Sequence, residues 1–180
     1  GAHSLIHSYD SPPIAEKGLD AARRYAEIAP AAPHALHMPS HIFTRVGYWK
    51  DSVAANAASA EAAKAGKEFH EQLHAMDYQV YAYLQLAQDK LARDVVEEMI
   101  AIGGYNPNIR TGFFAVAASE ARYAVERGDW KTASDLLVRP SKFAYVDAVT
   151  HFARAMGAAR SGNPDAARAD IARLATLRDS

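Results

Sequence analysis

Apolar residues recur at helical spacing along nearly the whole chain, and most of the positions between them hold alanine or polar residues. Alanine favours helices, and the β-branched residues form no run with the two-residue alternation of a strand. Glycine and proline interrupt this pattern regularly and divide it into about nine or ten helices. The expected helices cover approximately residues 2–10, 12–29, 34–46, 49–65, 69–87, 90–102, 109–127, 130–138, 142–160 and 164–178. The pattern therefore predicts an all-α protein with short connections.

The turns between these helices repeat a common layout, in which a turn residue is followed five positions later by a small residue. The pairs are Gly47 and Ser52, Ala87 and Ala92, Gly128 and Ala133, Gly162 and Ala167, with a looser copy at Pro13 and Gly18. Successive turn residues lie 34, 40, 41 and 34 positions apart. These intervals bracket the period of about 34 residues that tetratricopeptide (TPR) repeats have, with insertions in the middle two.

An aromatic residue precedes three of these turns by four positions, at Tyr9, Phe43 and Tyr83, and Pro30 closes the first unit. In this register the chain resembles the TPR superfamily over essentially its whole length. The strings HSLIHSYDSP, IAPAAPHALHMPSHIF and HAMDYQVYAYLQLAQD are similar to those at the C-terminal end of a group of larger bacterial TPR proteins. The resemblance implies one right-handed α-solenoid of antiparallel helix pairs within a longer chain, and it implies no catalytic activity. The expected units cover residues 1–30, 31–66, 69–103, 108–139 and 142–178.

Charge and apolar content narrow the classes of partner. Twenty lysines and arginines against 21 aspartates and glutamates leave a net charge of -1. The chain therefore lacks the net positive charge that would attract nucleic acid. No apolar run approaches the roughly 20 residues that span a bilayer, so we expect a soluble protein without membrane insertion. Cysteine is absent, which excludes disulfides and thiolate metal sites. The compartment stays open between bacterial cytoplasm and periplasm.

The histidines fall on one stripe of the expected repeat. In a TPR-like solenoid the first helix of each pair lines the concave groove, and positions about thirteen, ten, six and three before the turn share one face. The residues at these positions are His3, His7 and Asp10 in the first unit, His34, His37, His41 and Thr44 in the second, and His74, Asp77 and Tyr81 in the third. The sequence thus predicts a histidine-lined groove in the first half of the chain.

Two functions are compatible with such a groove. The first hypothesis is a non-enzymatic scaffold, without a cofactor, that binds a peptide, a partner protein, a small polar ligand or another part of the longer chain. The alternative is a metal-binding protein or metal-dependent hydrolase, because imidazoles and carboxylates at helical spacing are ligands for zinc or another first-row transition metal. The candidate ligands are His37, His41, His74, Asp77, His3 and His7. Protonation near pH 6 would strengthen binding of an anionic ligand and release a metal, so the two hypotheses predict opposite signs.

The pentapeptide HEQLH at residues 70–74 has the spacing of a helical zinc peptidase motif. In that interpretation His70 and His74 hold the metal, Glu71 is the general base, and Glu97 or Glu98 is the third ligand. The repeat register opposes it, because it places His74 in the groove and His70 at or before the start of its helix. We therefore expect a chance match, a protein that is not an enzyme, and no catalytic residue.

Several other conspicuous residues are expected to have packing roles. Ser40 occupies a small-residue position of the repeat, and Trp49 and Trp130 directly follow turns. His151 lies off the groove stripe, so we expect a packed and hydrogen-bonded histidine. Pro39 is expected to mark or bend the start of its helix.

Overall fold

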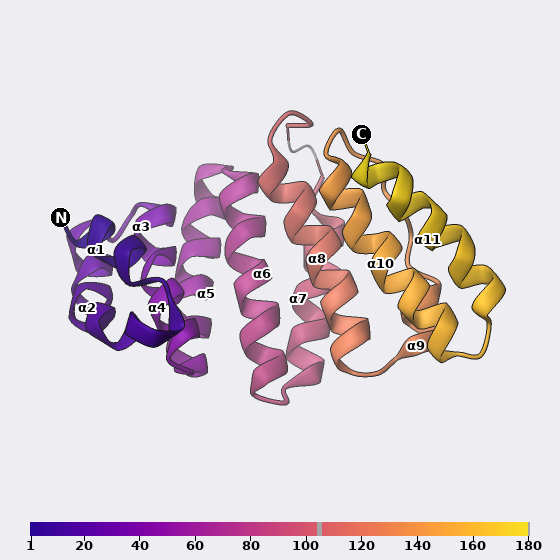
Figure 1. The fold of residues 1–180 in the computed structure, drawn as a ribbon. Coiled ribbons are helices and arrows are strands. Elements are labelled where there is room, and N and C mark those ends of the chain that lie inside the picture. The colour runs from indigo at the N-terminus through magenta and orange to yellow at the C-terminus, as the bar shows by residue number, and fades with distance from the viewer. Residues whose placement is uncertain (104–105, 180) are drawn as a thin grey trace. The chain divides into compact units, whose positions relative to one another are not determined.

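The computed structural model describes residues 1–103 and 106–179, and every regular element in this part of the chain is helical (Figure 1). The absence of strands from the described residues confirms the all-α prediction. The chain divides by its internal contacts into two compact units, residues 1–104 and 105–180, and each is described by itself. The stacking of all repeats into one solenoid domain stays a prediction.

The first unit holds α1 (Ala2–Tyr9), the 3-10 helix η1 (Pro12–Gly18), α2 (Leu19–Ile28), α3 (Pro33–His37), α4 (Pro39–Arg45), α5 (Trp49–Gly66), α6 (Phe69–Gln85) and α7 (Asp89–Ala101). The second holds α8 (Arg110–Glu126), α9 (Trp130–Ser134), α10 (Ala144–Arg160) and α11 (Pro164–Arg178).

The repeated turn residues share an unusual backbone conformation. Gly47, Gly128 and Gly162 have φ angles of 77°, 66° and 81°. Ala87 takes the same left-handed conformation with φ 55°, although it carries a Cβ atom. A left-handed residue just after a helix lets the chain reverse and bond back to the last carbonyls, which is why glycine is favoured there. The structure confirms these four positions as turns.

The small residues five positions after each turn lie at helix contacts. Ser52, Ala92 and Ala133 are fully buried, and Ala167 and Gly18 are buried as well. At Gly18 a Cβ atom would lie 2.7 Å from the end of the Ile42 side chain, so a larger residue there would force Ile42 to move. The repeated layout therefore has a packing cause, because small side chains let neighbouring helices approach closely.

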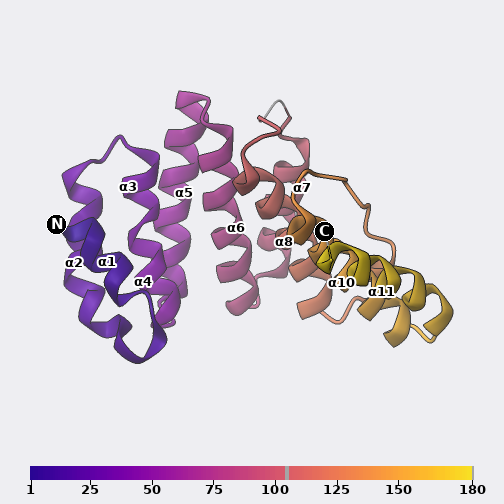
Figure 2. The ribbon, with the colours of Figure 1, turned by 45° about the horizontal axis from the view of Figure 1, so that its top comes forward.

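The middle of the first unit is α5, which packs against α3 and α4 on one side and α6 on another, while α6 packs against α7 (Figures 1 and 2). Short turns at residues 67–68 and 86–88 make α5, α6 and α7 antiparallel neighbours. The apolar core at the start of the unit consists of Ile6, Ala21, Ala22, Met38, Ile42 and Phe43. Packing around this core brings α1 into contact with α4. The histidines of α1, His3 and His7, therefore lie near His41 of α4.

Two of the expected helices are each divided in two. The span 12–29 begins as a 3-10 helix after Ser11, and the span 34–46 is interrupted between His37 and Pro39. Proline has no backbone N–H to donate to the carbonyl four residues earlier, so the α-helical ladder breaks at Pro39 as its position suggested. The helix expected over 130–138 is shorter in the structure. It ends at Ser134, and residues 135–139 form a turn and irregular chain.

In the second unit α10 packs against α8, α9 and α11. Gly157 of α10 lies so close to α9 that a Cβ atom there would meet the Ser134 backbone nitrogen at 2.4 Å. His151 of α10 links this helix to α11, because its Nδ1 atom lies 2.6 Å from Asp170 Oδ1. His151 is thus a hydrogen-bonded packing residue, as its position predicts. Nowhere in the described ranges is a helix both long and apolar enough to cross a membrane.

Candidate functional site

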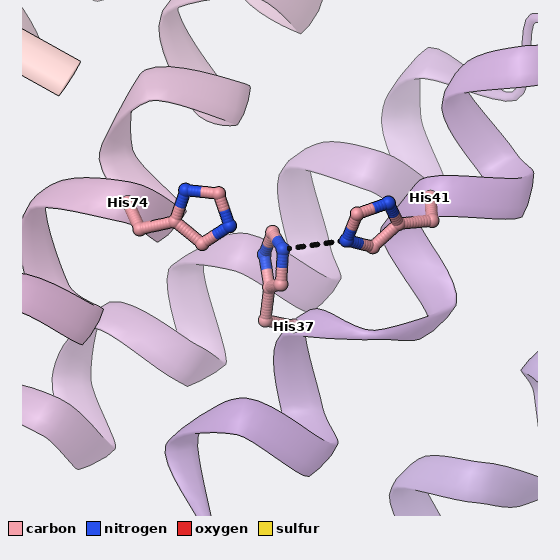
Figure 3. Close-up of side chains that lie close together, drawn as sticks. All are labelled: His37, His41 and His74. Atoms are coloured by element: carbon pink, nitrogen blue, oxygen red, sulfur yellow. Dashed lines mark hydrogen bonds between the residues drawn. The ribbon is translucent and has the colours of Figure 1, made fainter. Parts of the chain in front are cut away.

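Three histidine rings meet where α3, α4 and α6 face one another (Figure 3). His37 ends α3, His41 lies one turn later on α4, and His74 comes from α6. Figure 3 shows the His37 ring between the other two, 4.9 Å from the His41 ring and 4.4 Å from the His74 ring between centroids. One ligand nitrogen from each residue lies within 4.8 Å of the other two. Among the described residues, this is the group of histidines and carboxylates in which three side chains bring their ligand atoms this close together.

The orientation of His37 is fixed from α5. Its Nδ1 atom lies 2.7 Å from Asn56 Oδ1, and both side chains are almost fully buried. The Asn56 amide nitrogen donates to the Ser52 backbone carbonyl at 2.8 Å, so the amide oxygen is the atom that faces His37. That oxygen is an acceptor, so His37 Nδ1 carries the proton and donates. In a neutral ring, Nε2 is then the nitrogen with the free lone pair.

His41 is oriented in the same way by a carboxylate. Its Nδ1 atom lies 2.9 Å from Asp10 Oδ2, and the other oxygen of Asp10 accepts from Arg45 Nε at 2.7 Å. Burial by itself would raise the pKa of Asp10, but the hydrogen bonds from Arg45 and His41 outweigh it and lower that pKa. An ionised Asp10 is only an acceptor, so His41 Nδ1 donates and His41 Nε2 of the neutral ring keeps its lone pair. The Tyr78 hydroxyl lies 3.3 Å from the same Nδ1 atom.

The two lone pairs point at each other. His37 Nε2 and His41 Nε2 are 3.1 Å apart, and both donors of the two rings are already used at Nδ1. Two acceptors at hydrogen-bond distance repel unless a proton or a metal cation lies between them. The arrangement therefore has a place for one positive charge.

Burial acts against a proton as that charge. It lowers the pKa of His37 to about 2, with the neighbouring His74 and His41 adding to the effect. Burial also lowers the pKa of His41, although the hydrogen bond and charge of Asp10 oppose it. For His74 burial again lowers the pKa, against the carboxylates of Asp77 and Glu71. All three rings are thus neutral at pH 7, which is the form in which imidazole binds a metal.

The spacing suits tetrahedral zinc. Two nitrogens bound to one zinc ion at 2.0–2.1 Å are about 3.3 Å apart across a tetrahedral edge. The Nε2 atoms of His37 and His41 nearly have this separation before any ion is considered. His74 lies at up to 4.8 Å, so its ring would move inward to complete the set. The hydrogen bonds of the ligands at Nδ1, to Asn56 and Asp10, are the outer-sphere contacts that hold ligating histidines in metal proteins.

A second set of histidines lies beside the first and nearer the surface. His3 Nε2 lies 3.2 Å from His34 Nε2 and 3.2 Å from His7 Nε2, so the three nitrogens form a row with His3 in the middle. The His7 ring is 5.9 Å from the His41 ring, and the His34 ring is 6.5 Å from the His37 ring. We call His37, His41 and His74 the inner trio, and His3, His7 and His34 the outer row.

The remaining residues of the predicted groove stripe have other neighbours. Thr44 Oγ1 lies 3.0 Å from Ser52 Oγ, and the Tyr81 ring contacts Trp49 with 5.6 Å between centroids. Asp77 is a buried residue of α6, three positions after His74, and its carboxylate is not part of the inner trio. Asp10 holds a histidine ring in place by a hydrogen bond. The stripe thus brings the six histidines together, while Thr44 and Tyr81 contact residues of α5.

Two residues of the site were not predicted. Asn56 lies in an alanine-rich helix, and its only signal was a polar side chain on the face that also carries Ser52 and Ser59. Tyr78 follows His74 by one helical turn, and its ring contacts those of His37, His41 and His74. A search for helical neighbours of each histidine would have found Tyr78. Ser40 is fully buried, as a packing position requires, and lies 3.4 Å from Asn56 Oδ1.

The two histidines of the HEQLH segment differ in whether they belong to the inner trio. His74 is grouped with His37 and His41, and His70 is not a member of that set. Glu71 lies 3.7 Å from His34, between its Oε2 and the ring Nδ1. A peptidase site would need both histidines of the pentapeptide on one ion.

No family model matches the chain, and neither a curated protein nor a solved structure matches it.

Proposed function

We propose that the first unit binds a first-row transition metal ion, in the first place Zn²⁺, through His37, His41 and His74. The observation that carries this proposal is the pair of facing lone pairs at His37 Nε2 and His41 Nε2, 3.1 Å apart. Asn56 and Asp10 fix the donor hydrogens of both rings on the opposite nitrogens. Three imidazoles with no thiolate select zinc, copper, nickel or iron over magnesium and calcium, which prefer oxygen ligands.

The ion would join three helices. His37, His41 and His74 belong to α3, α4 and α6, which α5 already holds side by side. The site is mostly shielded from water, because the side chain of His41 is only 16% exposed and that of His37 is buried. We expect a structural ion with three protein ligands and at most one water, in a protein that is not an enzyme. Of the two sequence hypotheses, we therefore favour the alternative, a metal-binding protein or metal-dependent hydrolase. Within it we favour metal binding without hydrolysis.

A second candidate function is supported by a different observation. The left-handed turns at Gly47, Ala87, Gly128 and Gly162, with a buried small residue five positions after each, support the TPR-like repeat register. We propose that the repeats form a scaffold for a peptide or protein partner, with the metal stabilising the first unit. The two proposals are compatible, because one concerns an ion between helices and the other concerns a surface.

The test of the metal proposal is a zinc titration of protein purified without an affinity tag and treated with a chelator. We expect tight binding at pH 7.5 that is almost constant down to pH 6.5, because the pKa values of His37, His41 and His74 all lie below the ordinary 6.5. Below those pKa values each ligand that takes up a proton adds up to a tenfold rise in Kd per pH unit. Calorimetric titrations at several pH values measure this profile.

The sign of the pH dependence separates the hypotheses. An anionic ligand bound to imidazolium groups would bind more tightly as the pH falls. Zinc affinity that is absent at pH 7.5, or that increases toward acid pH, would contradict the metal proposal.

A further inference from the structure

In the outer row of histidines, one ring nitrogen has more close nitrogen neighbours than it can form hydrogen bonds with. His3 Nε2 is within 3.2 Å of two other Nε2 atoms, those of His7 and His34. A single ring nitrogen either donates one hydrogen or accepts through one lone pair. In neutral rings, His3 Nε2 therefore forms at most one good hydrogen bond. The other nitrogen at 3.2 Å is then close to His3 Nε2 without a hydrogen bond between them.

The chemistry of the row is that of a ligand set. His3 and His7 lie one turn apart on α1, and His34 comes from α3, so two separate helices contribute nitrogens. Each neighbouring pair is separated by 3.2 Å, close to the edge of about 3.3 Å expected for two nitrogens on one tetrahedral zinc ion. A carboxylate is also near, because Glu71 Oε2 lies 3.7 Å from His34 Nδ1. Glu71 is too far away for a hydrogen bond, but its charge lies on the Nδ1 side of the His34 ring, while Nε2 is the nitrogen that faces His3.

We infer that His3, His7 and His34 form a second transition-metal position at the surface of the first unit. This inference rests on the proposed function of the inner trio only for the class of ion, and its ligands are entirely different residues. The outer position is the weaker one, since its nitrogens form a row whose ends must close on the ion and the His34 side chain is 53% exposed. Water completes its coordination, as at other solvent-facing imidazole sites.

The two positions belong to one continuous cluster. The rings of His7 and His41, and those of His34 and His37, are near neighbours across α1, α3 and α4. The first unit is therefore expected to hold two ions, one between helices and one at the surface.

The experiment measures zinc stoichiometry by native mass spectrometry and calorimetry on tag-free, chelator-treated protein. The outer variant carries His3→Ala and His7→Ala, which are partly exposed or exposed positions on α1 where alanine favours the helix. The inner variant carries His41→Ala. We expect two ions on the wild type, one tightly bound ion on the outer variant, and one weakly bound ion on the inner variant. Circular dichroism checks that both variants are folded.

Each other outcome has a definite meaning. One ion on both wild type and outer variant would overturn the outer position and leave the inner one intact. One ion on the wild type and none on the outer variant would support the outer position and overturn the inner one. A wild type that binds no zinc at millimolar concentration would overturn both.

Discussion

Replacing His74 by alanine is expected to weaken zinc binding at the inner trio by a factor of about 200. Metal sites of this size contribute about 10 kcal/mol in total, so one of three ligands accounts for roughly 3 kcal/mol. His74 is a good position for the test, because it comes from α6 while the other two ligands come from α3 and α4. The measurement is a competition titration against a chelator of known zinc affinity at pH 7.5.

The matched control is His70→Ala, one turn earlier on the same helix. It removes an equal side chain from the HEQLH segment, but His70 is not a member of the inner trio. We expect this variant to bind zinc as tightly as the wild type. Equal losses in the two variants would contradict the assignment and favour the peptidase-like pair, and no loss in either would exclude His74 as a ligand.

Zinc is expected to slow amide hydrogen exchange in α3, α4 and α6 by about 100-fold when its free concentration is 100 times the Kd. An ion that binds only the folded state adds RT ln(1 + [Zn]/Kd), which is about 2.7 kcal/mol under these conditions. The amides concerned are those that exchange through unfolding of the first unit, because the ion must leave before the three helices separate. Hydrogen exchange followed by mass spectrometry measures the effect helix by helix.

The His41→Ala variant is the control for this effect, because its ring supplies one of the two facing nitrogens. In that variant the same zinc concentration should leave the exchange of α3, α4 and α6 almost unchanged. Full slowing in the variant would show that the ion acts elsewhere on the chain. Absence of slowing in the wild type at a saturating concentration would contradict an ion that joins these helices.

The helices and their turns were predictable because each depends on local sequence. A left-handed residue after a helix and a small residue five positions later are needed wherever two helices reverse and pack, so they recur at Gly47, Ala87, Gly128 and Gly162. The histidine stripe was predictable for the same reason, since one helical face follows from the period of the helix. The division of the second histidine helix at Pro39 followed from its missing N–H.

The division of the six histidines into an inner trio and an outer row was not predictable. It depends on how α1, α3, α4 and α6 pack across long sequence separations, and the residue that orients His37 comes from α5. Asn56 looked like any polar residue in an alanine-rich helix until the packing placed it 2.7 Å from the His37 ring. Asp77 was a candidate ligand by type and spacing, but it is buried and is not part of the inner trio. Asp10 was expected in the groove, and it pairs with His41 and Arg45. Spacing along one helix identifies a shared face, whereas the choice of ligand depends on the helix opposite.

The most direct test of the central proposal is X-ray absorption at the zinc edge of protein loaded with one equivalent of zinc. The facing nitrogens of His37 and His41, with His74 closing the set, predict a four-coordinate ion with three imidazole nitrogens at 2.0–2.1 Å. The outer-shell scattering of three imidazole rings should accompany them. A first shell made mainly of oxygen atoms, or one with a single imidazole, would contradict the inner trio as a metal site.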